Sequence, residues 1–172
     1  MRDFLLPFVK EKWVPFETLS DWAKEIHKSG KTIVSVNGCF DILHPGHLHL
    51  LFEAASLGDV LIVALNADVS IRTYKNALRP IHTMEERVNL IGSLAPVDYV
   101  TSFDDATPIG FIRTIRPDVH VVGDEYKDRA VEKEAVEEGG GHMHFVRKVP
   151  PFSSSRTIER ILERYEKVRS CE

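Results

Sequence analysis

The sequence predicts an α/β protein in which a doubly wound, parallel sheet of about five strands is covered by helices on both faces. Two observations support this prediction. Segments of strand character alternate five times with segments of helical character along the 172 residues, a pattern typical of parallel sheets. Residues 59–66 (DVLIVALN) form a nearly continuous apolar run, as expected for a parallel strand buried on both faces.

The N-terminal half begins with an expected arm, followed by a helix. Thr18 or Ser20 precedes the apolar stripe of this helix, and Gly30 ends it, as helix start and stop signals require. The β-branched run after Gly30 predicts the first strand. The further segments expected in this half are a strand at 32–36, a helix at 46–57, a strand at 59–66 and a polar, partly helical connection at 67–80.

The C-terminal half continues the alternation. Thr83 and Glu86 have the spacing of a capping box at the start of a helix, and Thr107 with Pro108 opens another helix that stops near Pro117. The expected strands cover 97–102, 119–122 and 143–146, and the expected helices cover 83–94, 107–117, 129–138 and the residues after 153.

Composition excludes several classes of protein. The chain is 43% hydrophobic and 28% charged, which is ordinary for a globular protein, and its net charge of −4 argues against nucleic-acid binding. The two cysteines, Cys39 and Cys171, make no disulfide framework and fit a reducing compartment. With no signal peptide and no apolar run of about 18 residues, we expect a cytoplasmic protein with no membrane partner.

The chain is expected to form one domain over residues 31–172, with residues 1–30 as an N-terminal extension and helix packed on it. Its strongest local motif is NGCFDILHPGH at residues 37–47, which follows the first strand and enters a helix. Ligands of such sheets bind at the carboxyl ends of the strands. The motif therefore stands where a ligand site is expected.

The residues of this motif suit phosphate binding. Gly38 allows the backbone to approach a ligand closely, and Pro45 with Gly46 places His47 in the first helical turn, where free amides and the helix dipole favour an anion. His44 and His47 can donate hydrogen bonds to phosphate oxygens as charge grows in a transition state. His44 and His47 could also be a pair of metal ligands or ordinary surface residues. His49 is interpreted as a structural residue.

The motif resembles the HxGH signature of the cytidylyltransferase-like nucleotidyltransferases, and in particular their heptose 1-phosphate adenylyltransferase branch in ADP-heptose synthesis. The resemblance covers about residues 31–161. Beyond the first motif it rests on an ordered set of blocks: GDVLIVALNAD at 58–68, Lys75 with Arg79-Pro80, Glu86-Arg87, Thr107-Pro108, RPD at 116–118, GDEYK at 123–127, and SSS at 153–155 followed by IERI at 158–161.

The resemblance implies a reaction and a set of roles. The phosphate oxygen of an acceptor attacks the α-phosphorus of a nucleoside triphosphate and releases pyrophosphate, with Mg²⁺ on the triphosphate. His44, His47 and Lys75 are the implied catalytic residues, and Lys75 with Arg79 is implied to bind substrate phosphate. The nucleotide-binding residues that it implies are Asn37, Gly38, Cys39, Phe40, Gly46, Gly123, Asp124, Tyr126, Ser153, Ser154 and Ser155, and no protein residue is implied as a metal ligand.

Several of these residues also have a simpler interpretation. Lys75 could be a solvated lysine, the serines could cap a helix, and Asp124 and Tyr126 could serve loop packing. Asp41 could hold the loop or approach a metal. Cys39 is expected to act through its backbone, since a catalytic thiolate would need a nearby base.

The resemblance implies an adenylyltransferase that converts ATP and heptose 1-phosphate into ADP-heptose for lipopolysaccharide or another surface glycan. The alternative is a cytidylyltransferase acting on glycerol 3-phosphate or a related alcohol phosphate. The rival from another class of protein is a nucleotide sensor without turnover. The GDEYK sequence at 123–127 departs from the usual GGDYK, which leaves the base preference open. The expected partners are the small-molecule substrates, a homodimer mate, and a pathway kinase on a separate chain.

Overall fold

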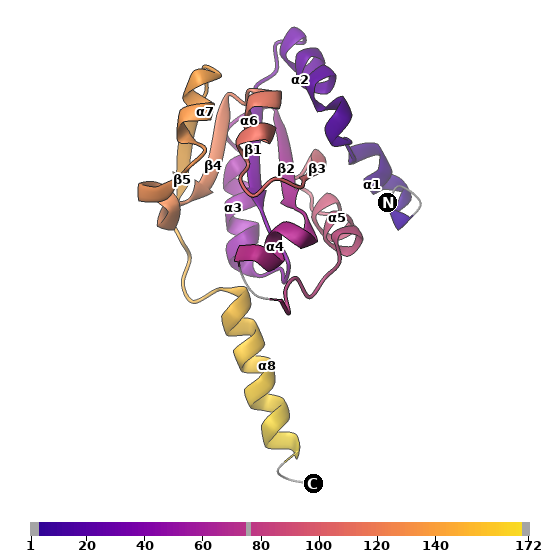
Figure 1. Cartoon of the computed structure of the whole chain (residues 1–172), viewed down its shortest axis with the longest axis vertical. Helices are drawn as coiled ribbons and strands as arrows, with labels where there is room; N and C mark the ends of the chain where they lie inside the picture. The colour runs from indigo at the N-terminus through magenta and orange to yellow at the C-terminus, as the bar shows by residue number, and fades with distance from the viewer. Residues whose placement is uncertain (1–3, 75–76, 170–172) are drawn as a thin grey trace.

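Five parallel strands form a single sheet whose order is β3-β2-β1-β4-β5 (Figure 1). The computed structural model describes residues 4–74 and 77–169. The strands are β1 (Ile33–Gly38), β2 (Val60–Asn66), β3 (Tyr99–Phe103), β4 (Val119–Gly123) and β5 (His142–Val146). The chain builds outward from β1 to β3, then returns to the other side of β1 for β4 and β5. This confirms the doubly wound sheet and puts its switch point between β1 and β4.

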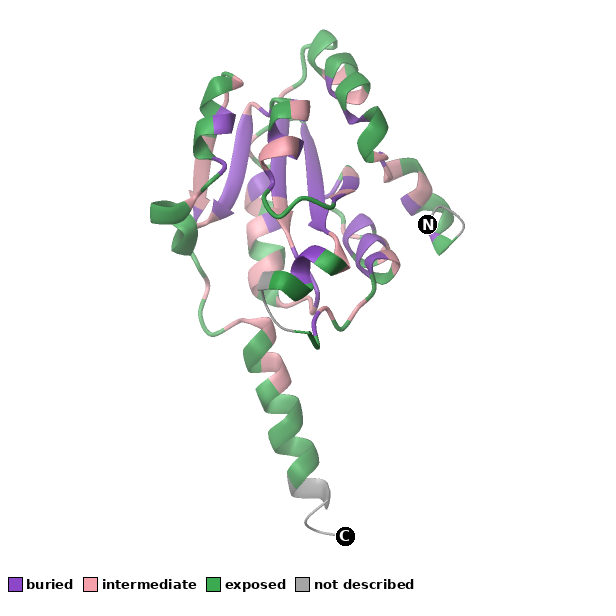
Figure 2. Ribbon diagram, in the orientation of Figure 1, coloured by how far each residue is buried: buried purple, intermediate pink, exposed green. Residues whose placement is uncertain are grey.

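Helices cover both faces of the sheet, as predicted. On one face, β1 and β2 pack against α1 (Pro7–Lys12), α3 (Pro45–Ala55) and α5 (Met84–Gly92). On the other face they pack against α2 (Leu19–Lys28), α6 (Ile109–Ile115) and α7 (Lys133–Glu138). All seven residues of β2 are buried (Figure 2), which is the burial that its continuous apolar run predicts.

The N-terminal segment is more structured than the expected arm. Pro7 begins α1 at a position where its missing N–H is harmless. Leu6 donates its N–H to the Asn89 side chain of α5 at 2.8 Å. Val14 donates its N–H to the carbonyl of Val100 at 2.9 Å, so the segment runs beside β3. Residues 4–30 thus contribute to both apolar clusters of the domain.

The remaining helices differ in their boundaries from those that the sequence predicts. A short 3₁₀ helix, η2 (Phe16–Thr18), precedes α2, and α4 (Asp68–Tyr74) occupies the connection expected to be partly helical. The continuous helix expected over 129–138 is wrong: η3 (Asp124–Arg129) is a 3₁₀ helix, and α7 begins only at Lys133. Ala130 is extended and separates them, with φ −69° and ψ 92°.

The C-terminal helix α8 (Ser154–Arg169) extends away from the sheet and is largely exposed beyond its first turns (Figures 1 and 2). None of the helices in the described ranges combines the length and apolar character needed to cross a bilayer.

Candidate active site

A cavity of about 420 Å³ opens at the carboxyl ends of β1 and β4, at the switch point of the sheet. This volume is in the range of small-molecule sites. Its walls come from the loop after β1, the first turn of α3, the segment after β4, and the connection between β5 and α8. The lining includes Asn37, Gly38, Cys39, Phe40, His44, Gly46, His47, Gly123, Tyr126, Ser153 and Ser154.

His44 and His47 are two neighbouring residues of the cavity lining. Their rings stack with centroids 3.7 Å apart and an angle of 17° between the planes. His44 is the N-cap of α3, and its Nδ1 accepts the backbone N–H of His47 at 3.3 Å. Because Nδ1 is an acceptor, the neutral His44 ring carries its proton on Nε2 and has a donor left for a ligand.

Burial lowers the pKa of His44, and the positive charge of nearby Lys148 lowers it further, against a contact with its own backbone that raises it. The neutral ring is therefore favoured at neutral pH. In this neutral form, the unprotonated Nδ1 of His44 can cap the helix while the Nε2–H donates to a ligand.

Gly46 lets the two histidines adopt this stacked arrangement. A Cβ at this position would lie 3.1 Å from Nδ1 and Cε1 of the His44 ring and 3.5 Å from Cβ of Phe152. At Gly38, a Cβ would lie 2.8 Å from the ring of Phe40. Phe40 itself has φ 45°, which is rare for a residue with a side chain. At Gly38 and Gly46, the backbone around the loop after β1 thus packs so closely against neighbouring side chains that a larger residue would not fit without a shift.

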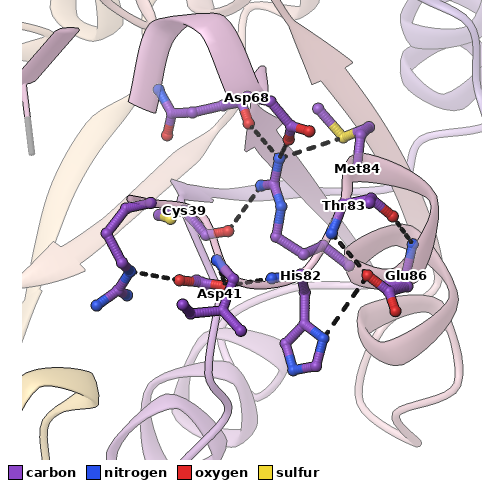
Figure 3. Close-up of polar contacts among 11 residues, drawn as sticks. Cys39, Asp41, Asp68, His82, Thr83, Met84 and Glu86 are labelled. Atoms are coloured by element: carbon purple, nitrogen blue, oxygen red, sulfur yellow. Dashed lines mark hydrogen bonds and ion pairs between the residues drawn. The ribbon is translucent and has the colours of Figure 1, made fainter. Parts of the chain in front are cut away.

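Asp41 holds this loop to the segment before α5 (Figure 3). Its carboxylate is fully buried, forms an ion pair with Nε of Arg79 at 2.5 Å, and accepts the backbone N–H groups of Ile81 and His82, both at 2.8 Å. Burial raises the pKa of Asp41, but the two backbone donors and Arg79 outweigh it, so the net shift is downward. Because the Asp41 carboxylate already has these three donors, its contacts favour a role in holding the loop over a role near a metal ion.

Arg87 on α5 is a second anchor, and sequence reasoning did not assign it a role in the site. Its side chain is fully buried. Nη1 donates to the carbonyl of Cys39 at 2.8 Å, and Nη2 donates to the carbonyl of Asn66 at 2.9 Å and to Oδ1 of Asp68 at 2.6 Å (Figure 3). Arg87 thereby ties the loop after β1 to the end of β2. The available signal was its place in the Glu86-Arg87 block.

The serine cluster meets the site at the start of α8. Ser153 accepts the backbone N–H of Arg156 at 3.1 Å, and Ser154 donates to the carbonyl of Ile42 at 3.2 Å. Both border the cavity, whereas Ser155 is exposed and does not. Ser153 and Ser154 can therefore take part both in the local hydrogen bonds at the start of α8 and in binding a ligand in the cavity.

The segments after β4 and β5 form the opposite wall. Asp124 accepts the backbone N–H of Lys148 at 3.1 Å, and Glu125 lies 3.6 Å from Nζ of Lys148. Tyr126 borders the cavity and stacks beneath the guanidinium of Arg129 at 5.1 Å. Asp124 thus links the two segments without lining the cavity itself.

Two other predicted residues, Lys75 and Arg79, have different outcomes. Lys75 lies outside the described residues. Arg79 is buried and paired with Asp41, so the structure places it as a support of the loop. His49, expected to be structural, pairs with Glu53 at 3.4 Å but also borders the cavity.

A buried polar group behind the cavity was also missed. Ser35 and His120 are fully buried on adjacent strands, and His120 contacts Asn37 and Glu132, both of which border the cavity. Polar residues inside otherwise apolar strands were the signal that could have revealed it.

Comparison with known proteins shows the family to which the chain is related. The model of the cytidylyltransferase-like family matches residues 35–172. The curated relatives include the bifunctional protein HldE of Syntrophotalea carbinolica, 43% identical over 151 residues, which are 87% of this chain and 31% of that protein. HldE of Geobacter sulfurreducens is 44% identical over 137 residues, which are 79% of this chain and 28% of that protein. The chain thus spans about a third of the length of these relatives.

Solved structures agree with the fold. A lipopolysaccharide core biosynthesis protein from Thermoplasma volcanium matches 72% of this chain and 100% of its own, with 31% identity and a TM-score of 0.59. A pantoate-beta-alanine ligase from Francisella tularensis, with 16% identity and a TM-score of 0.62, covers 91% of this chain and 78% of its own and is similar in fold.

Proposed function

The chain belongs to the cytidylyltransferase-like family of nucleotidyltransferases, and from this membership we propose that it is an adenylyltransferase that joins AMP from ATP to heptose 1-phosphate. The products are ADP-heptose and pyrophosphate. The observation that carries the proposal is the stacked His44–His47 pair at the start of α3, in one cavity with the serines at the start of α8.

The proposed step is an in-line displacement at the α-phosphorus of ATP. A phosphate oxygen of the acceptor forms the new P–O bond, and the bond between the α-phosphorus and the bridging oxygen breaks, so that its electron pair leaves with pyrophosphate. No protein nucleophile is needed, and the protein acts by positioning two anions and stabilising charge.

His44 and His47 are proposed to contact the triphosphate where that charge develops. The Nε2–H of a neutral His44 is a donor, and both rings are held by stacking and by the first turn of α3. Preorganised donors of this kind stabilise a transition state without having to reorganise during the reaction. Lys75 remains a proposed third contributor to phosphate binding.

The starts of α3 and α8 both border the cavity, and the positive end of a helix dipole suits the phosphates of ATP. Ser153 and Ser154 are proposed to add hydroxyl donors to the β- and γ-phosphates. Gly123, Tyr126 and the backbone near them are proposed to hold the nucleoside. Asp124 and Ser155 lie beside these groups, and a direct contact with the nucleotide stays a prediction for both.

Mg²⁺ is proposed to accompany ATP. Within the described part of the chain, no group of three or more histidine, cysteine, aspartate or glutamate side chains is arranged to hold a metal, and the Asp41 carboxylate already has three donors. These residues fit an ion coordinated chiefly by phosphate oxygens and water. Bound there, it would neutralise the triphosphate.

The name of one relative supports a role in lipopolysaccharide synthesis, and the heptose acceptor itself follows from the resemblance of the sequence motifs. One similar structure is a lipopolysaccharide core biosynthesis protein, and the HldE relatives are named bifunctional. Because those relatives combine two functions in a longer protein, a kinase on a separate chain stays a prediction for this one, as does a homodimer.

The test is pyrophosphate release by the purified protein with Mg²⁺, with ATP and CTP each combined with heptose 1-phosphate and glycerol 3-phosphate. The proposal expects release only with ATP and the heptose phosphate. Release only with CTP and glycerol 3-phosphate would replace the proposed substrates with those of the alternative. Nucleotide binding without release in any combination would support a sensor.

A further inference from the structure

A chain of buried polar groups connects the core of the sheet to the cavity. Ser35 on β1 and His120 on β4 are both fully buried. The Ser35 hydroxyl lies 2.7 Å from Nδ1 of His120, and Nε2 of His120 lies 3.0 Å from Oδ1 of Asn37. Both ring nitrogens are therefore engaged, and the chain ends at a residue that borders the cavity.

Glu132, which lies just before α7, adds a charge to this chain. One of its carboxylate oxygens lies 3.7 Å from Nε2 of His120, and the residue is only 7% exposed. Burial raises the pKa of Glu132, but its contact with His120 and its own backbone lower it more, so the net shift is downward. Glu132 is thus ionised at neutral pH.

An anion beside Nε2 determines where the imidazole carries its proton. A carboxylate at this distance stabilises a proton on Nε2, while a bare Nε2 would place its lone pair against the negative charge. In the neutral ring Nδ1 is then an acceptor, and the Ser35 hydroxyl is its donor. The Glu132 carboxylate and the Ser35 hydroxyl therefore favour the same tautomer.

This proton position fixes the side-chain amide of Asn37. Nε2–H donates to Oδ1 of Asn37, which leaves the two N–H groups of Nδ2 for a ligand. The other tautomer would put two acceptors, Nε2 and Oδ1, against each other. The amide would then reverse and offer its oxygen to the cavity, where it would oppose the oxygens of a phosphorylated ligand.

We propose that Glu132, acting through His120, is a positioning residue that holds the Asn37 amide with its N–H groups available to an oxygen of the bound nucleotide. The identity of the ligand rests on the proposed function, whereas the proton position on His120 does not. The oxygen belongs either to a phosphate or to the nucleoside, and both offer the same acceptor chemistry.

The first test is NMR of the histidine rings in the full chain without ligand. The ¹⁵N shifts of His120, assigned with His120→Gln, should show a proton on Nε2, and Glu132→Gln should weaken this preference. Glu134→Gln is the matched control, because Glu134 is an exposed acid two residues along the chain from Glu132. A neutral ring protonated only on Nδ1, or ¹⁵N shifts that Glu132→Gln leaves unchanged, would overturn the proposal even if the protein is an adenylyltransferase.

The second test is calorimetric binding of Mg²⁺-ATP and of pyrophosphate. Losing one oriented donor weakens binding by roughly three- to tenfold, so Glu132→Gln should lower ATP affinity by about this factor and Glu134→Gln should not. Weaker binding of both ligands assigns the contact to the β- or γ-phosphate, and weaker binding of ATP alone assigns it to the AMP part, which is the α-phosphate or the nucleoside. Unchanged affinity for both ligands would overturn the proposal.

Substitution of His120 separates positioning from packing. The amide nitrogen of His120→Gln reaches toward the place of Nε2, whereas that of His120→Asn reaches only toward the place of Nδ1. For folded variants, His120→Gln should retain most of the ATP affinity, and His120→Asn should show the roughly three- to tenfold loss. Equal losses in both would mean that His120 serves the packing alone.

Discussion

Nη1 of Arg87 donates a 2.8 Å hydrogen bond to the carbonyl oxygen of Cys39, a residue 48 positions earlier in the chain. This contact fixes the backbone of the loop after β1 from the side of α5. Because the same guanidinium also binds the carbonyl of Asn66 and the carboxylate of Asp68, one buried cation shapes the wall of the cavity that holds the histidines. The geometry of the site thus depends on residues that do not line it.

Replacing Arg87 should destabilise the protein strongly. Arg87→Met keeps the apolar stem but leaves two buried carbonyls and the Asp68 carboxylate without their donor, so the free energy of unfolding in urea should fall by about 3–5 kcal/mol. Arg113→Met is the control, because its ion pair with Glu138 is well exposed and should contribute about 0–1 kcal/mol. Similar losses in the two variants would contradict the anchoring role.

The Asp41–Arg79 pair should give the protein a distinct response to acid. The folded pKa of Asp41 is lowered, so its stabilising contribution is fully present above its unfolded pKa of about 4 and is lost as the pH falls through the folded value. In urea unfolding, the stability difference between the wild type and Asp41→Asn should therefore be constant near pH 6 and shrink below about pH 4. A difference that stays constant at lower pH would contradict this assignment.

His44 should titrate below the usual histidine range. Burial and Lys148 lower its pKa, so the ring stabilises the fold above its unfolded pKa of about 6.5, and this contribution is lost as the pH falls toward the folded value. The NMR shift of its Cε1–H, assigned with His44→Gln, should have a midpoint below about 6.5. Lys148→Ala should move the midpoint upward, and a wild-type midpoint above the usual value would refute the prediction.

Gly46→Ala should impair turnover without unfolding the protein. The added Cβ would lie 3.1 Å from the His44 ring, which must then shift by a few tenths of an ångström from its stacked position. Because a misplacement of about 1 Å can cost about 10²-fold in rate, the rate should fall by less than about 10²-fold. Alanine is otherwise favoured over glycine in helices. At Gly110 in α6, an added Cβ meets within 3 Å only the end of the Asp105 side chain, so Gly110→Ala should retain its rate. Equal rates in the two variants would remove the steric role of Gly46.

The sequence was informative wherever a signal is local. The continuous apolar run predicts the central buried strand β2, and the Thr83–Glu86 spacing predicts a capping box that the structure contains in full. The motif at residues 37–47 placed the two histidines at the start of a helix because its turn residues and Pro45 act over a few positions.

The sequence was least informative where the site depends on distant partners. Asp41 with Arg79, Arg87 with Cys39, and His120 with Asn37 each join segments that are separate in sequence. Only the fold brings them together, so periodicity and spacing cannot pair them. The expected arm was mistaken for a similar reason, since α1 is short and is held by its packing on α5.

The measurement that tests the account most directly compares His47→Ala with the wild type, recording pyrophosphate release and ATP affinity on the same preparations. Loss of one donor to a developing charge lowers turnover by about 10²- to 10³-fold, so kcat should fall by this factor while the Kd for Mg²⁺-ATP changes by less than about tenfold. That result would assign His47 to the transition state of nucleotidyl transfer. Unchanged turnover in the variant would contradict the account, because the stacked histidine pair would then have no part in the reaction.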